Sequence, residues 1–282
     1  MDIRPSPIAG RWYPDDPGAL TRMVDGFLQA AEPPLRAPAA RIVGLLAPHA
    51  GLLYSGPVAA YAYELVRGLA VDVVAVVSPS HFHADAPVLT SAHAAYATPL
   101  GVVPVDQAAL APLRAKLAEA LGRPPEEVLA ALRHDREHAV EIELPFLQRV
   151  LAPGFQLLPL MLRDQSERVA RALGQALAEV LLGRRVLVVA SSDLSHYYPQ
   201  PVALQMDGAM LEAVRACDPE KVLAVQAAGR GFACGAGALA AALWAGQALG
   251  ATTAQVLRQA TSGDISGDYE QVVGYAAAVF QR

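Results

Sequence analysis

The sequence predicts an α/β fold in a single domain, with a central, mostly parallel sheet and helices on both of its faces. Three short apolar runs rich in Val, Ile and Leu, at residues 42–47, 73–77 and 186–190, fit strands that are buried on both faces of a parallel sheet. Segments with helical patterns alternate with these runs, which is typical of this fold class. No linker or internal repeat divides the 282 residues, so we expect one domain over residues 1–282.

The order of the elements follows from capping residues, periodicity and turn residues. A capped amphipathic helix begins at Asp16-Pro17, and a proline-rich connector follows at residues 32–38. After the first strand, a helix from Ser55 to about residue 69 and a strand at 71–78 complete a right-handed βαβ unit. Further elements are expected as short strands or a hairpin within 85–105, helices near 106–121, 125–132, 137–151, 166–182, 203–215, 218–228 and 235–249, and strands at 155–162, 185–191, 252–260 and 271–280.

The composition is that of a globular protein, with 54% hydrophobic and 17% charged residues. The net charge of −5 comes without a basic block, which argues against nucleic acid or an anionic membrane surface as a partner. No apolar run reaches the roughly 18 residues that a membrane span needs. The first residues also lack the pattern of a signal peptide, so we expect a cytoplasmic location.

The two cysteines, Cys217 and Cys234, are too few for a disulfide framework. Cys217 lies in a helical pattern, where a free thiol is usually a small buried hydrophobic group. Cys234 lies in a glycine-rich turn at residues 229–237, where the backbone can approach a ligand closely. A functional and a structural role are therefore both open for Cys234.

Each of the three apolar runs ends in a polar loop that contains a histidine. His49 follows the first run, His81 the second, and Asp193 and His196 the third. Because parallel sheets bind ligands at the carboxyl ends of their strands, we expect these four side chains to meet in one site. Imidazoles with one anionic ligand suit iron, copper or catalytic zinc. One assignment gives the metal to His49 and His81 and makes His196 either an acid–base group or a residue that hydrogen-bonds a metal ligand. A single histidine after a strand is more often a hydrogen-bonded turn residue, and it is the occurrence of three that favours a shared site.

A second metal motif lies between these loops. His134, Glu137 and His138 match H-x-x-E-H, the zinc peptidase pattern in which two histidines one helical turn apart bind zinc and the glutamate acts as a base. The motif requires a helix that includes His134. Asp135 and Glu137 could equally mark a helix start behind a loop, which would give Glu137, His138 and Glu141 a structural role or a place at the rim of a pocket.

An ordered set of motifs extends over nearly the whole chain. These motifs are Arg4 with G-R-W-Y ending at Tyr13, P-H-A-G-x-x-Y-S-G at 48–56, P-S-H at 79–81, T-P-L-G at 98–101, E-H-x-x-E-x-x-L-P-F-L at 137–147, S-S-D-L-S-H at 191–196, C-G at 234–235, and S-G-D and V-V-G-Y-A near the end. Together they resemble the Memo-like family, which includes protein B of the so-called AmmeMemoRadiSam system.

The resemblance implies a single α/β domain related to the class III, non-haem iron extradiol ring-cleaving dioxygenases. It also implies a metal pocket built from His49, His81 and Cys234, with Asp193 and His196 beside it as catalytic groups. The dioxygenases use a carboxylate as the third ligand, whereas a thiol here favours copper(I), zinc or a different iron chemistry. The name of this system further implies that the gene lies near genes for an AMMECR1-type domain and a radical SAM protein, which makes these two proteins candidate partners.

Three functions therefore stay open at the level of the sequence. The first is a metal-binding redox enzyme that holds iron or copper, or alternatively zinc, and acts on a small molecule. The second is a non-catalytic module that recognises a small molecule or a peptide with the same pocket. The third is a zinc hydrolase built on His134, Glu137 and His138.

Overall fold

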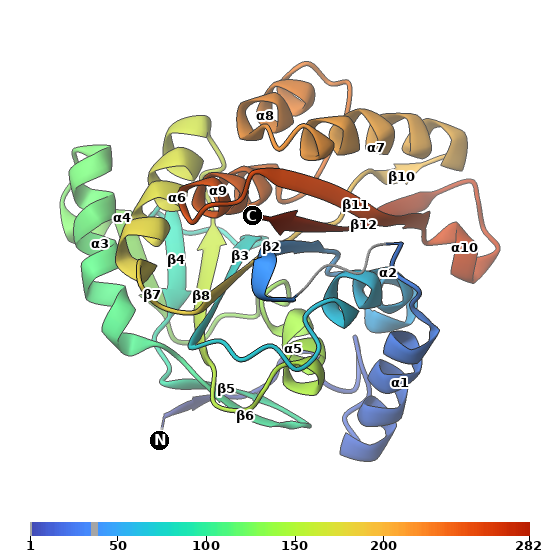
Figure 1. Ribbon diagram of the computed structural model, residues 1–282, viewed down its shortest axis with the longest axis horizontal. Coiled ribbons are helices and arrows are strands. Elements are labelled where there is room, and N and C mark those ends of the chain that lie inside the picture. Colours follow the sequence, from blue (N-terminus) through green and yellow to red (C-terminus); the bar gives the residue numbers. More distant parts are fainter. Residues whose placement is uncertain (1, 35–38) are drawn as a thin grey trace.

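A mixed sheet of nine strands forms the centre of the molecule in the computed structural model, which describes residues 2–34 and 39–282 (Figure 1). Its four central strands are parallel, as predicted, and lie in the order β2 (Ile42–Ala47), β9 (Val186–Ser191), β3 (Val73–Pro79) and β8 (Gln156–Leu162). Successive residues of β3 alternate between two hydrophobic cores: Val73 and Val77 face one core and Val74 faces the other. This two-sided burial explains why the run is apolar throughout.

Antiparallel strands extend the sheet on both sides of the parallel centre. On one side, the long strand β12 (Val272–Gln281) pairs with β2, β11 (Thr253–Thr261) and β10 (His196–Tyr198). On the other side, β4 (Val88–Ser91) is antiparallel to β8 and parallel to β7 (Leu129–Leu132). The sheet is thus parallel at its centre and mixed over its full width.

Helices cover both faces of the sheet, which confirms the predicted fold class. Figure 1 shows α7, α8 and α9 above the sheet and α1, α2 and α5 below it. The first core joins the sheet to α3 (Gln107–Leu121), α6 (Glu167–Leu181), α7 (Gln200–Arg215), α8 (Pro219–Ala227) and α9 (Ala236–Ala248). The second core joins the sheet to α1 (Pro17–Ala30), α2 (Leu52–Glu64) and α5 (Leu144–Val150).

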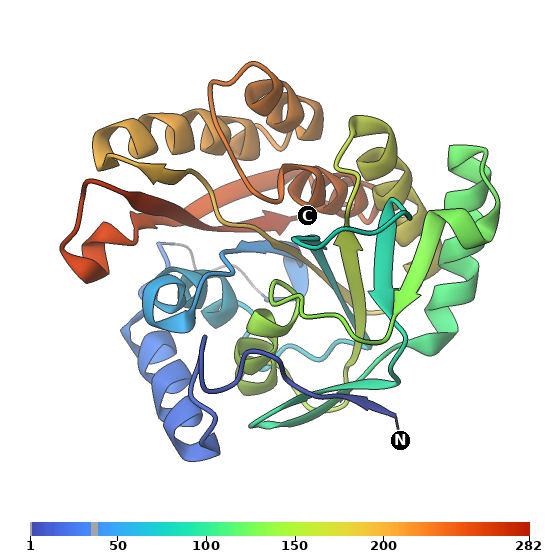
Figure 2. The same ribbon diagram turned by 180° about the vertical axis from the view of Figure 1, so that it is seen from behind.

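A small second sheet holds the beginning of the chain. Its strands are β1 (Ile3–Arg4), β5 (Ala95–Thr98) and β6 (Gly101–Pro104), and the last two form the hairpin expected within residues 85–105. Figure 2 shows the first residues, in dark blue, beside this green hairpin. Among the described residues, no helix combines the length and the apolar character that crossing a membrane requires.

Several predicted boundaries were wrong. The helix expected at 125–132 stops after α4 (Pro125–Val128), because residues 129–132 pair with β4 as β7. The helix expected at 137–151 begins only with the 3-10 turn Glu141–Glu143, before α5. Helix α2 starts three residues earlier than expected, since the N–H of Leu52 bonds to the carbonyl of Trp12 at 2.8 Å.

Four shorter elements complete the chain. Strands β1 and β10 and the short helix α10 (Gly263–Ser266) were not predicted, and a 3-10 turn at Ala39–Arg41 leads into β2. Residues 35–38 of the expected connector lie outside the described part of the chain.

Candidate metal centre

Three donor side chains meet at the carboxyl edge of the parallel strands. His49 follows β2, His81 follows β3, and Cys234 precedes α9. One ligand atom from each of these residues lies within 4.8 Å of the other two. The Sγ atom of Cys234 is 3.1 Å from Nε2 of His49, and the rings of His49 and His81 meet edge to face at 5.3 Å. The structure therefore brings together the three residues that the family resemblance assigned to a metal.

The turn before α9 carries Cys234 into this edge of the sheet. A Cβ atom at Gly235 would lie 2.9 Å from the carbonyl oxygen of Ser191 and 3.0 Å from Cβ of Ser192, so only glycine fits there. The N–H of Gly235 donates to Oγ of Ser192 at 2.9 Å. The side chain of Gln165 donates to the carbonyl of Cys234 at 2.7 Å, which fixes the turn from its other side.

Ser191 determines which nitrogen of His49 faces the donor cluster. The hydroxyl of Ser191 donates to the carbonyl of Ala139 at 2.6 Å, so its oxygen is left to accept from Nδ1 of His49 at 2.9 Å. Nε2 of His49 then carries the lone pair on the side of Cys234. Burial lowers the pKa of His49 to about 3, and the charge of His81 acts in the same direction, so the ring is neutral at pH 7.

Glu137 orients His81 in the same way. Its Oε1 is 2.9 Å from Nδ1 of His81 and its Oε2 accepts the backbone N–H of His81 at 2.6 Å. Burial alone would raise the pKa of Glu137, but its bonds to His81 hold that pKa at about 2. Burial lowers the pKa of His81, and the hydrogen bond and charge of Glu137 outweigh this effect, so the net shift is upward. A carboxylate on Nδ1 leaves Nε2 of His81 for a metal, as is common for histidine ligands.

Cys234 is a thiol rather than a thiolate in the absence of a metal. Burial raises the pKa of Cys234 well above its ordinary range, and the nearby charge of Asp193 adds to the increase. The backbone N–H of Asp193 donates to Sγ at 3.3 Å. Because metals bind the thiolate, a metal ion would displace the proton of Cys234.

His138 also lies at this edge of the sheet, although the assignment to His49, His81 and Cys234 did not include it. Its ring stacks on His81 at 4.6 Å, lies tilted against the ring of Trp12 at 4.1 Å, and meets His49 edge to face at 5.3 Å. Burial lowers the pKa of His138 to about 3, and His49 contributes to this shift. Ligand atoms of His81, Glu137 and His138 form a second group within 4.8 Å.

His134 does not join this second group. Residues 133–138 form an irregular loop, so the helical turn that the zinc peptidase pattern requires is absent from this segment. His134 instead lines a separate cavity. Glu137 and His138 therefore reach the centre as parts of a loop that supports His81.

Asp193 and His196 take different positions beside the three donors. Oδ1 of Asp193 accepts the backbone N–H groups of His49 at 2.7 Å and of Ala50 at 3.2 Å, while its Oδ2 is 4.0 Å from Nε2 of His49. Burial raises the pKa of Asp193 to about 6. His196 lies in β10, where Nδ1 donates to the carbonyl of Leu194 at 2.7 Å and the ring meets Phe232 edge to face at 5.5 Å. Among the described residues, His196 belongs to neither group of converging donors.

Comparison with known proteins agrees with the resemblance read from the motifs. A family model described as "Memo-like protein" matches residues 4–279. A MEMO1 family protein of Nitrosopumilus maritimus is 35% identical over 282 residues, which cover 99% of each chain. Another, from Thermotoga neapolitana, is 36% identical over 288 residues, covering 98% of this chain and 99% of the relative. The chain therefore belongs to the Memo-like family.

Proposed function

We propose that the chain binds one metal ion through His49, His81 and Cys234 and acts as a redox enzyme on a small molecule. The observation that carries this proposal is the convergence of the three donor atoms within 4.8 Å at the carboxyl edge of the parallel strands. Ser191 and Glu137 support it, because each holds a histidine with the lone pair of Nε2 available. Two imidazoles and one thiolate fit iron, copper or zinc.

A bound iron or copper ion would supply one-electron chemistry, and the protein residues around it would hold the substrate and move protons. We assign the acid–base role to His196. Its Nδ1–H is fixed on the carbonyl of Leu194, which leaves Nε2 to exchange a proton with a substrate. We assign to Asp193 the role of holding the His49 loop through two backbone N–H groups.

Metal analysis of single variants tests this proposal. We expect wild-type protein purified without oxygen to carry close to one iron or copper ion per chain, and His49→Ala and Cys234→Ser to lose most of it. Cys217→Ser and His83→Ala are the matched controls, since neither residue contributes to a converging donor group in the described structure. Unchanged metal in both site variants would refute the proposal.

A second candidate function is a binding module for a small molecule or for a peptide of a partner protein. The observation that favours it is a pair of exposed aromatic rings next to the loops of the centre: Tyr54 is 40% exposed and Tyr197 is 71% exposed. Such rings are common at protein recognition sites. The module would retain a bound peptide after chelation of the metal, whereas the enzyme would lose turnover.

A further inference from the structure

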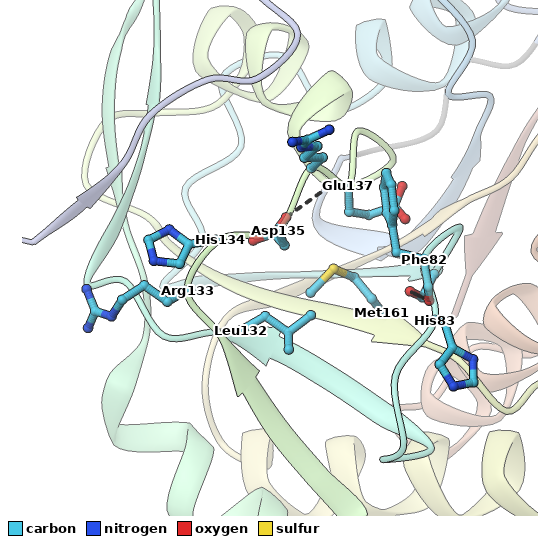
Figure 3. Close-up of a pocket in the computed structure, with 10 residues that line it drawn as sticks. Phe82, His83, Leu132, Arg133, His134, Asp135, Glu137 and Met161 are labelled. Carbon is cyan, nitrogen blue, oxygen red and sulfur yellow. Dashed lines mark hydrogen bonds between the residues drawn. The ribbon is translucent and has the colours of Figure 1, made fainter.

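A cavity of about 420 Å³ lies next to the candidate metal centre (Figure 3). Its walls come from the loop after β3, the loop after β7 and residue Met161 of β8. Ser80 and Glu137 line it, and these residues precede and hold the donor His81. Of the described residues that line the cavity, none belongs to the set His49, His81 and Cys234. It is therefore a separate site that shares a wall with the centre.

One part of the cavity wall is apolar, although most of the lining residues are polar or charged. In the view of Figure 3, Met161 lies between Leu132 and Phe82. Met161 is buried, Leu132 is partly buried, and Phe82, which directly follows His81, is 45% exposed. An aromatic ring beside a leucine side chain forms a surface on which a flat apolar body packs well. The volume lies in the range of roughly 300–1,000 Å³ that is usual for small-molecule sites.

One arginine at the cavity forms no ion pair with any residue that the structure describes. The two carboxylates of the wall already take part in ion pairs: Asp135 pairs with Arg4 at 2.7 Å, an arginine that also contacts Glu141, and Glu137 pairs with His81 at 2.9 Å. Arg133 pairs with Asp2 at 2.7 Å. Arg136 is exposed and, within residues 2–34 and 39–282, has no ion-pair partner. Its guanidinium is available to a ligand.

We propose that this cavity binds a small aromatic monocarboxylate, with the ring against Phe82 and Leu132 and the carboxylate on Arg136. A guanidinium matches the geometry of a carboxylate in a two-point contact. A single arginine without an ion-pair partner among the described residues balances one negative charge, which favours a carboxylate over a doubly charged phosphate. The cavity does not require a bound metal. Ligand binding at the cavity therefore goes beyond the proposed metal enzyme and can be tested independently of it.

Calorimetric titration with 2-naphthoate tests the site. From the binding free energy per non-hydrogen atom that is usual for small ligands, we expect 2-naphthoate to bind with a dissociation constant of about 1 mM or tighter. Arg136→Met should weaken 2-naphthoate by about 10-fold, a change of the size expected for a lost charge-assisted contact, and should not change the weaker binding of the neutral 2-naphthamide. Phe82→Ala should weaken both compounds, because both lose the aromatic contact.

The controls separate this cavity from the metal centre and from loss of fold. Arg215→Met, at an exposed arginine of α7, should bind like wild type. Cys234→Ser and chelated wild type should also retain 2-naphthoate, and both cavity variants should keep the wild-type melting temperature. Equal binding by wild type, Arg136→Met and Phe82→Ala would overturn the proposal, as would loss of binding in Cys234→Ser or no binding to wild type at all.

Discussion

Glu143 shows what complete burial does to a single residue close to the candidate centre. It lies in the 3-10 turn before α5, and its Oε2 accepts the hydroxyl proton of Tyr63 at 2.6 Å. Its Oε1 has no hydrogen-bond partner within the described residues. Burial raises the pKa of Glu143 to about 8, and the bond from Tyr63 offsets only part of this shift. The folded protein therefore holds Glu143 protonated at neutral pH.

The raised pKa of Glu143 predicts a pH-dependent stability. Below the unfolded-state pKa of 4.5, the carboxyl is neutral in both the folded and the unfolded protein. As the pH rises from 4.5 to about 8, the unfolded state ionises while the folded state stays protonated, so the contribution of Glu143 to stability is lost over this range. Glu143→Gln should therefore become more stable relative to wild type as the pH rises from 5 to 9, by on the order of a few kcal/mol. Urea unfolding of both proteins across this range measures the difference.

The exposed Glu126 supplies the control for this titration, because Glu126→Gln should leave the wild-type pH dependence in place. Parallel stability curves for wild type and Glu143→Gln would show that Glu143 does not titrate differently on folding.

At the scale of elements, the packing of α6 on α9 depends on one glycine. A Cβ atom at Gly174 would lie 2.6 Å from the carbonyl oxygen of Ala241 and 2.7 Å from Cβ of Trp244. Both of these atoms belong to the framework of α9 and cannot move independently of the helix. The close approach of the two helices therefore requires a residue without a side chain.

Replacement of two helix glycines by alanine should have opposite effects. Gly174→Ala should destabilise the protein by about 1–3 kcal/mol, because the overpacking cost exceeds the gain in helix propensity of about 1 kcal/mol. Gly26→Ala in α1, where nothing lies within 4 Å of the added Cβ, should stabilise it by about 0.5–1 kcal/mol. Urea unfolding at pH 7 measures the free energy of unfolding of both variants. A Gly174→Ala variant more stable than wild type would contradict the close packing of α6 on α9.

Local sequence determined the long elements and left the short ones undetermined. The runs that form β2, β3 and β9 were predicted because burial on both faces demands apolar residues throughout. The segment 129–132, Leu-Ala-Ala-Leu, suits a helix or a strand equally well, and its pairing with β4 decides between them. Strand β1 is held by pairing with β5 over two residues, a contact without any local periodicity.

At the scale of the whole molecule, the sequence predicted only the part of the site that follows from a parallel sheet, in which the carboxyl ends of the strands lie at one edge. His49 and His81 could be placed together because each follows a buried strand. Local context left Cys234 undecided, and the motif match assigned it to the pocket. The contact of Trp12 with His138 joins residues 126 positions apart and leaves no signal in spacing. The bond of Ser191 to His49 was likewise missed, although its place at the end of β9 could have suggested it.

The most direct test of the central claim is an X-ray absorption spectrum of metal-loaded protein, purified without oxygen, for wild type and Cys234→Ser. A metal held at this edge of the sheet should show nitrogen and sulfur neighbours in wild type, and the sulfur signal should disappear in the variant. A stoichiometric metal whose spectrum is the same in both proteins would contradict the account, as would a wild-type protein that takes up no metal on reconstitution.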